Sequence, residues 1–247
     1  RCLEKSGSDL TVITQDGAIS LSAFLPIDQV AGSAQAISTN IQNEFLASTR
    51  AYSTVFGWQS ILYPQGSYSL FNIPRTSLLA DQYVINSQTG AWCKFTGQNA
   101  ACWSLFNGDL YFGAQDGGVI YKADTGTSDN SADIDWKIRP AFSYFGSRGN
   151  QKIFSLCRPH FTTNGAPAFA IDLNLNFSNI NPTNVPTTPT LSAAIWDTSK
   201  WDAGVWADEV TSQAWTTVFG IGECASPTIR GNTNSITLSF TAYDMIW

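Results

Sequence analysis

Short apolar runs separated by turn-forming residues recur along the first half of the chain. Asp9-Leu10, followed after four residues by Gln15-Asp16-Gly17, is repeated as Asp109-Leu110 and Gln115-Asp116-Gly117. Each copy lies between two apolar runs, and Asp-Gly accepts the positive φ angles of a type I′ turn. The pattern therefore predicts two β-hairpins with type I′ turns at Asp16-Gly17 and Asp116-Gly117.

Three more hairpins are expected between these two, with turns at residues 63–66, 86–90 and 107–108. Short strands at such even spacing are typical of an antiparallel meander. A recurring hairpin of this kind suits propeller blades better than a closed barrel. Residues 1–135 are thus predicted to form a partial β-propeller-like meander.

One amphipathic helix interrupts this predicted meander near residues 37–56. Apolar side chains recur there at a spacing near four: Ile37, Ile41, Phe45, Tyr52 and Phe56. Thr39 and Gln42 have the spacing of a capping box. We expect the apolar face to pack on the protein's own sheet. A helix that binds a partner or a membrane surface is the alternative, although its polar face carries little Lys or Arg.

The second half of the chain has longer predicted strands. They follow the polar segment 124–135, which is expected to be a linker or long turn, and lie at 136–145, 152–162, 169–177, 215–219 and 235–246. Partial alternation, as in Ile171, Leu173, Leu175 and Phe177, predicts a β-sandwich-like domain over residues 136–247. Residues 179–190 are expected to form an extended surface loop. The predicted fold class is all-β.

Composition narrows the possible functions. The chain has 247 residues, a formal net charge of −6 and no run of Lys or Arg, which argues against sequence-specific nucleic-acid binding. No apolar stretch reaches the roughly 18–20 residues that cross a bilayer, so no membrane insertion is expected. The chain does not begin with Met, which suggests a processed chain or a fragment.

The five cysteines show no spacing typical of a metal site or a disulfide framework. They are Cys2, Cys93, Cys102, Cys157 and Cys224. Free Cys is among the most buried residue types, so we expect free thiols in buried strands. A reducing compartment and no disulfide, including between Cys93 and Cys102, are predicted.

No catalytic, cofactor-binding or metal-binding residue is predicted, and the chain is not expected to be an enzyme. His160 is the only histidine, and no G-x-S-x-G motif accompanies it, so a structural role is favoured. The acidic segment beginning at Asp124 resembles a calcium loop. It lacks the D-x-[DN]-x-[DN]-G pattern, because the third and fifth positions are Gly126 and Ser128, so metal binding is not expected there.

Tryptophans recur every five residues at Trp196, Trp201 and Trp206, with Asp197 and Asp202 beside the first two. Exposed indoles could stack on sugar rings, and paired carboxylates could hydrolyse a glycosidic bond. The favoured interpretation is that the Asp side chains cap local turns while the indoles anchor a loop.

Several stretches together resemble a known family of viral proteins. They are 56–59, 62–64, 89–93, 99–103, 108–113, 123–126, 142–147, the Trp-Asp segment and 220–222. This set is similar to the C-terminal half of tail proteins from short-tailed bacteriophages and prophages. These are the tail nozzle or head-to-tail connector proteins related to the packaged-DNA stabilisation proteins. The resemblance covers most of the chain and consists of turns and aromatics rather than a catalytic signature.

This resemblance implies a homo-oligomeric ring, expected to be a hexamer, in the phage tail of the virion. Assembly would take place in the bacterial host cytoplasm, with other tail proteins such as the adaptor and the tail spike or needle as partners. The bore would retain packaged DNA and pass it without sequence preference during ejection. The acidic balance is compatible with this role, because a wall that bound phosphate tightly would hinder sliding. The alternative is a glycan-binding tail adhesin that uses the exposed tryptophans.

Overall fold

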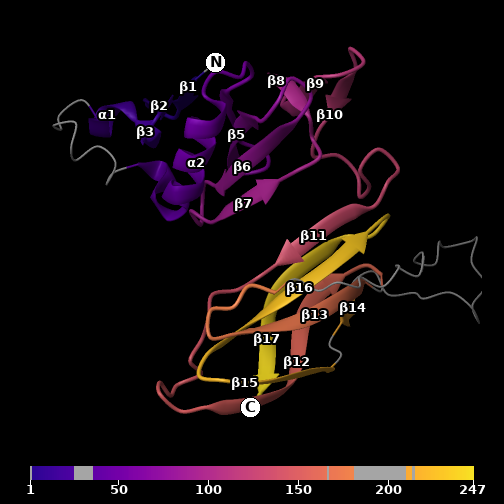
Figure 1. Cartoon of the computed structure of the whole chain (residues 1–247). Coiled ribbons are helices and arrows are strands. Elements are labelled where there is room, and N and C mark those ends of the chain that lie inside the picture. Colours follow the sequence, from indigo (N-terminus) through magenta and orange to yellow (C-terminus); the bar gives the residue numbers. More distant parts are fainter. Residues whose placement is uncertain (1, 25–35, 166, 181–209, 213–214) are drawn as a thin grey trace, which may run out of the picture. The chain divides into compact units, whose positions relative to one another are not determined.

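The computed structural model describes residues 2–24, 36–165, 167–180, 210–212 and 215–247 (Figure 1). The fold is all-β, with antiparallel sheets and one main helical segment, as the sequence predicts. The chain forms two compact units, Arg1–Thr125 and Gly126–Trp247. This division precedes the predicted boundary after residue 135, because strand β11 (Ile134–Ile138) crosses that position and pairs with β16 of the second unit.

The first unit contains three antiparallel sheets in chain order. Sheet A comprises β1 (Leu3–Ser6), β2 (Asp9–Thr14) and β3 (Gly17–Ser20). Sheet B comprises β4 (Gln59–Tyr63), β5 (Tyr68–Pro74), β6 (Ala80–Asn86) and β7 (Trp92–Phe95). Sheet C comprises β8 (Ala100–Phe106), β9 (Asp109–Ala114) and β10 (Ile120–Lys122). Within each sheet every strand pairs with the next along the chain, which confirms the predicted meander. The described residues do not form a closed propeller.

Both faces of sheet B contribute to a core, and alternate residues of its strands point to opposite sides. One face packs with sheet A and the helical segment through Ala18, Phe45, Phe71, Ile73 and Tyr83. The other face packs with sheet C through Tyr63, Leu70, Val84, Ala100, Trp103, Leu110 and Ala123. The neighbours Leu70 and Phe71 on β5 thus belong to two different cores.

The side-chain amide of Asn72 lies at the centre of the contact between sheets B and C. Its Nδ2 donates to the carbonyl oxygens of Gly57 (2.8 Å) and Ala100 (3.1 Å). Its Oδ1 accepts from Gln82 Nε2 (2.9 Å) and Trp103 Nε1 (3.1 Å). Asn72 is fully buried, and these bonds use all four of its hydrogen-bonding positions.

A second amide joins the same two sheets. Gln59 Nε2 donates to the Trp103 carbonyl oxygen (2.7 Å), and the Trp103 N–H donates to Gln59 Oε1 (2.9 Å). This pair of bonds imitates the exchange between residues of adjacent antiparallel strands. Hydrogen bonds of the Asn72 and Gln59 side-chain amides therefore connect sheets B and C, which share no backbone ladder.

The helical segment comprises a 3₁₀ turn, η2 (Ile37–Ile41), and helix α2 (Gln42–Tyr52). Phe45 is fully buried in the core shared with sheet B, which confirms that the helix packs on its own protein's sheet. The predicted end near residue 56 is wrong, because the helix ends at Tyr52 and Phe56 is exposed. A short additional helix, α1 (Leu21–Phe24), follows β3.

The predicted capping box is also wrong. The residue preceding η2 is Ala36, which makes no side-chain cap, and Thr39 Oγ1 donates back to the Ala36 carbonyl oxygen. Gln42 instead donates through Nε2 to the carbonyl oxygen of Asp16. The side chain that was expected to cap the helix therefore binds the turn between β2 and β3.

Both hairpins of the sequence repeat are present, but the predicted type I′ turns are wrong. Thr14 pairs with Gly17, so the first loop is Gln15-Asp16, and neither of these residues has a positive φ. The second loop spans residues 115–118, and its positive φ angles fall at Gly117 (+75°) and Gly118 (+62°). The register places Gly17 in strand β3, whereas Gly117 stays in the second loop, where Gly118 rather than Asp116 has the other positive φ.

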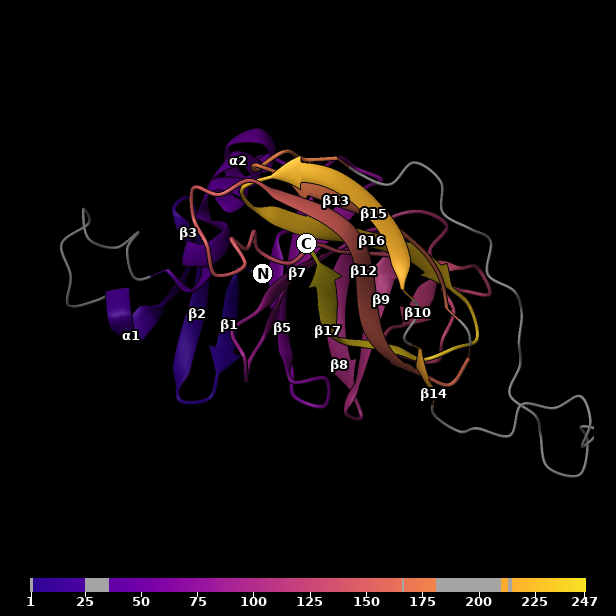
Figure 2. The same cartoon turned by 90° about the horizontal axis from the view of Figure 1, so that it is seen from below.

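The second unit is a two-sheet sandwich, as predicted. One sheet has the order β11, β16 (Ala225–Thr233), β13 (Ala168–Leu175). In the other, the long strand β12 (Lys152–Thr163) pairs with β17 (Leu238–Ile246) along one edge. Along its other edge β12 pairs with β15 (Thr216–Gly222) and β14 (Val210–Ser212), and Figure 2 shows its bent course. Both sheets contribute to one core: Phe154, Cys157, Leu173, Val218, Ala225 and Met245.

Strand β16 was not predicted, because it contains a proline and a glycine. Pro227 pairs with Leu173 of β13, whereas the ladder with β11 begins only at Ile229. Pro227 therefore has a strand neighbour on one side only, which a residue without an N–H tolerates. At Gly231 a Cβ atom would collide with the indole of Trp136. The glycine is required by this close approach.

The hydrogen bonds of Asn72 predict a large loss of stability in Asn72→Asp. This substitution removes both donors and places a carboxylate against two carbonyl oxygens in a buried site. We expect the free energy of unfolding to fall by about 3 kcal/mol or more in urea denaturation. Asn40 is exposed, so Asn40→Asp is the control and should change it by less than about 0.5 kcal/mol. Equal stability of the two variants would contradict the role given to Asn72.

The two hairpin glycines, Gly17 at the start of β3 and Gly117 in the second loop, predict unequal effects of valine. At Gly17 (φ +132°) a side chain would be strained and would also collide with Ser38 Oγ. At Gly117 (φ +75°) the nearest contact is an ordinary 3.7 Å from Val119. Gly17→Val should lower the free energy of unfolding by roughly 2 kcal/mol or more, and Gly117→Val by about 1 kcal/mol. Thermal unfolding tests this order, and a larger effect at Gly117 would refute it.

Candidate functional site

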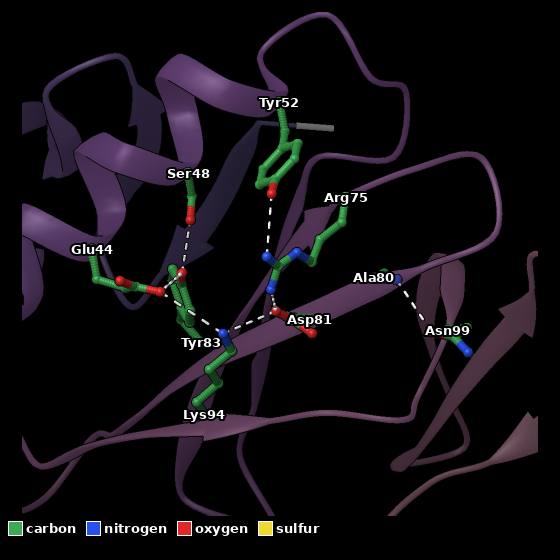
Figure 3. Close-up of polar contacts among 9 residues, drawn as sticks. All are labelled: Glu44, Ser48, Tyr52, Arg75, Ala80, Asp81, Tyr83, Lys94 and Asn99. Atoms are coloured by element: carbon green, nitrogen blue, oxygen red, sulfur yellow. Dashed lines mark hydrogen bonds and ion pairs between the residues drawn. The ribbon is translucent and has the colours of Figure 1, made fainter. Parts of the chain in front are cut away.

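A cluster of charged and phenolic side chains joins helix α2 to sheet B (Figure 3). Asp81 Oδ2 accepts from Arg75 Nη1 (2.6 Å) and Lys94 Nζ (3.0 Å). Arg75 also donates through Nη2 to the Tyr52 hydroxyl (3.2 Å), and its guanidinium lies over that ring. Lys94 Nζ lies 3.8 Å from Glu44 Oε1.

Tyr83 extends this cluster toward the helix. Its hydroxyl is 2.8 Å from Ser48 Oγ and donates to Glu44 Oε1 at 3.1 Å (Figure 3). Burial raises the pKa of Tyr83 to about 12, the Glu44 carboxylate acts in the same direction, and the Ser48 bond opposes it. The phenol is therefore neutral at physiological pH. The hydrogen bond from Arg75 to Asp81 likewise raises the pKa of Arg75 above its usual value.

The ion pairs of this cluster connect helix α2 with sheet B. Two cations, Arg75 and Lys94, face two carboxylates, Asp81 and Glu44, and each charge has an opposite neighbour. We interpret the cluster as an ionic contact that holds α2 on sheet B.

His160 lies within strand β12, where the sequence placed it, and its side chain joins two strands. Its Nε2 is 2.9 Å from Oδ2 of Asp244 on β17, and the same oxygen accepts from Arg158 Nε at 3.1 Å. These bonds, first that of Arg158 and then that of His160, lower the pKa of Asp244. The Arg158 guanidinium also lies 4.6 Å from the ring centroid of Trp215. Sequence reasoning missed Asp244, because it lies 84 residues from His160.

An apolar row crosses the outer face of the β12 sheet beside this charged group. It consists of Ile153, Phe219, Ile221 and Ile246, all exposed, with Phe219 reaching 78%. Ile153 pairs directly with Ile221 across two strands. The alternate residues Phe154 and Val218 point the other way, into the core. Alternation in the sequence predicts two faces, but it does not tell which apolar face is left open.

The structure does not describe the tryptophan series. Trp196, Trp201 and Trp206, with Asp197 and Asp202, lie outside the described residues, as does most of the predicted loop at 179–190. Glycan binding, glycosidic chemistry and loop anchoring at these positions stay predictions.

Among the described residues no group of three or more His, Cys, Asp or Glu side chains could hold a metal ion. Nor does any helix in this part of the chain have the length and apolarity to span a membrane. All five thiols are free, but the prediction of buried cysteines is wrong for Cys2, Cys93 and Cys102, which are exposed.

Comparison of the chain with protein-family models finds no match, and comparison with curated proteins finds none either. The likeness to phage tail proteins therefore depends on turns and aromatics in the sequence.

Glu4 is a buried acid at the contact between sheets A and B. It is 8% exposed, and neither its Oε1 nor the nearby buried Ser60 Oγ has a hydrogen-bond partner of acceptable geometry. Burial raises the pKa of Glu4 to about 7, and Ser60 opposes this shift only in part. The carboxyl is therefore protonated in mildly acidic solution while the protein is folded.

This pKa predicts that Glu4 makes the folded state less stable as pH rises. Between pH 4.5 and 7 the unfolded chain releases a proton that the folded chain retains. The free energy of unfolding should fall across this window by up to roughly 3 kcal/mol and level off above it. Glu4→Gln should abolish this loss, so the variant should be more stable than the wild type at pH 8 and similar to it at pH 4.

Urea unfolding of both proteins from pH 4 to 9 tests the prediction. The control is Glu223→Gln at an exposed position, which should keep the pH dependence of the wild type. A constant difference between Glu4→Gln and the wild type at all pH values would show that Glu4 does not titrate in this way.

Proposed function

We propose that the chain is a structural, non-catalytic subunit of a short-tailed phage tail, within a nozzle or head-to-tail connector ring. In this role it retains packaged DNA and forms part of the conduit for genome ejection. Its partners are further copies of itself, most simply in a hexameric ring, and other tail proteins such as the adaptor and the tail spike or needle. Its location is the virion.

The apolar row on the β12 sheet is the observation that carries this proposal. Phe219, Ile221 and Ile153 project from paired strands into solvent, next to the charged group of Arg158 and Asp244. Contiguous exposed apolar side chains rimmed by polar residues are typical of protein–protein contact surfaces. A fold that leaves such a row open is suited to assembly with a neighbouring subunit.

Charge supports the same role. The net charge of −6 disfavours tight binding to phosphates, which suits a wall past which DNA slides. The two charged clusters are internally paired, around Asp81 in the first unit and Asp244 in the second. Their side chains thus stabilise the frame, and the family resemblance supplies the specific setting of a phage tail.

The proposal predicts that the double variant Phe219→Asp, Ile221→Asp loses assembly. Both side chains are exposed, so the subunit should fold normally, while two carboxylates would be buried at a subunit contact. Analytical ultracentrifugation of the full-length protein, with and without its adaptor, should show a ring for the wild type and smaller species for the variant. Leu79→Asp, also at an exposed leucine, is the control and should assemble. A monomeric wild type in both conditions that is also absent from purified particles would refute the proposal.

A further inference from the structure

The dipeptide Asn-Gly occurs twice in the chain, at Asn107-Gly108 and at Asn164-Gly165. In such a pair the backbone nitrogen of the glycine can attack the side-chain amide carbon of the asparagine, because glycine has no Cβ to hinder the approach. The five-membered ring that forms requires an asparagine side chain that is free to rotate and a glycine N–H without a hydrogen bond. The two sites differ in both respects.

Asn107 and Gly108 form the two-residue turn between β8 and β9. Their φ angles are +52° and +87°, as in a type I′ turn, and Phe106 pairs with Asp109 on either side of them. Both turn residues are exposed. Among the described residues, neither the Asn107 side chain nor the Gly108 N–H makes a hydrogen bond. The amide carbon and the attacking nitrogen are therefore both accessible.

Asn164 and Gly165 are restrained by hydrogen bonds. Asn164 is half-buried, and its Oδ1 accepts from the backbone N–H of Thr237 at 2.7 Å. The Gly165 N–H donates to Oγ1 of Thr163 at 3.2 Å, and Thr163 is fully buried. Ring closure at this site has to break both bonds. The same dipeptide is thus held at one site and free at the other.

We propose that Asn107 is a site of spontaneous deamidation, in which water converts the side-chain amide to a carboxylate. The Gly108 nitrogen loses its proton and forms a bond to Cγ of Asn107. The bond from Cγ to the amide nitrogen breaks, and ammonia leaves with that proton. Water then opens the cyclic imide, which gives aspartate after attack at Cγ and isoaspartate after attack at the backbone carbonyl carbon. The net reaction consumes water and releases ammonia, with no oxidant or reductant.

Both products alter the hairpin of β8 and β9. A carboxylate at position 107 adds a negative charge two residues from Asp109, whose Oδ2 lies 2.7 Å from Lys122 Nζ. Isoaspartate also adds a carbon atom to the backbone of a two-residue turn, which disturbs the pairing of Phe106 with Asp109. The change is irreversible, so altered hairpins accumulate with the age of the protein.

Peptide mass spectrometry of the purified 247-residue chain, incubated in mildly alkaline buffer, compares both sites in one molecule. Asn107 should lose its amide at least roughly tenfold faster than Asn164, because only Asn164 has to break two hydrogen bonds first. In guanidinium chloride that unfolds the chain, the two rates should converge, because the dipeptide is the same. Equal rates in the folded protein, a faster loss at Asn164, or an Asn107 that reacts only in the unfolded chain would overturn the proposal.

Two variants test the cause and the consequence. Thr163→Val keeps the shape of a buried side chain but removes the acceptor of the Gly165 N–H, so amide loss should accelerate at Asn164 and stay the same at Asn107. Asn107→Gly keeps a residue that tolerates a positive φ and removes the amide. Gly108→Ala is unsuitable, because its Cβ would collide with Gln65 Nε2.

After incubation the midpoint of thermal unfolding should fall in the wild type and stay constant in Asn107→Gly. An equal fall in both proteins would refute the effect on the hairpin. An unchanged rate at Asn164 in Thr163→Val would refute the protection assigned to its hydrogen bonds.

Discussion

The four hydrogen bonds of Asn72 are the constraint on which the first unit depends. A buried amide that left any donor or acceptor unpaired would cost about 1–3 kcal/mol, so the four partners have to be in place together. Two of them, Ala100 and Trp103, belong to sheet C, and Gln82 belongs to sheet B. The amide therefore fixes the position of sheet C on sheet B, and the apolar core that includes Leu70 and Trp103 forms around that position.

Two clusters of charged side chains connect elements of the fold, and exposed apolar side chains occur in both units. Asp81 holds Arg75 and Lys94 at the helix, and Asp244 holds Arg158 and His160 across two strands. The exposed apolar side chains include Phe219 in the sandwich and Phe106 on sheet C. Exposed apolar surfaces of this kind are typical of protein–protein contacts, and they support the proposed role in assembly.

Local patterns predict the elements of this fold better than its details. Alternation at Ile171, Leu173 and Leu175 predicts a sandwich strand, and the spacing around Phe45 predicts the helix, because each pattern depends only on neighbouring residues. The prediction of a type I′ turn at Asp16-Gly17 is wrong, because the turn type depends on which residues pair across the hairpin. Strand β16 was not predicted, because its Gly231 packs against Trp136 in a long-range contact that the local sequence does not show. The exposed apolar surfaces could not be predicted either, because the exposure of Phe219 depends on how whole sheets pack.

Because of the buried Glu4, sheet A is held on sheet B less firmly than sheet C is. Between sheets B and C, Gln59 exchanges two hydrogen bonds with Trp103, whereas between sheets A and B the buried Glu4 carboxyl lacks a partner at Oε1. Gln42 and Thr49 donate hydrogen bonds to the turn between β2 and β3, but β1 is an edge strand that these bonds do not hold. At neutral pH, β1 should therefore open by itself more often than β4. Its backbone amides would then exchange with solvent while the rest of the unit stays folded.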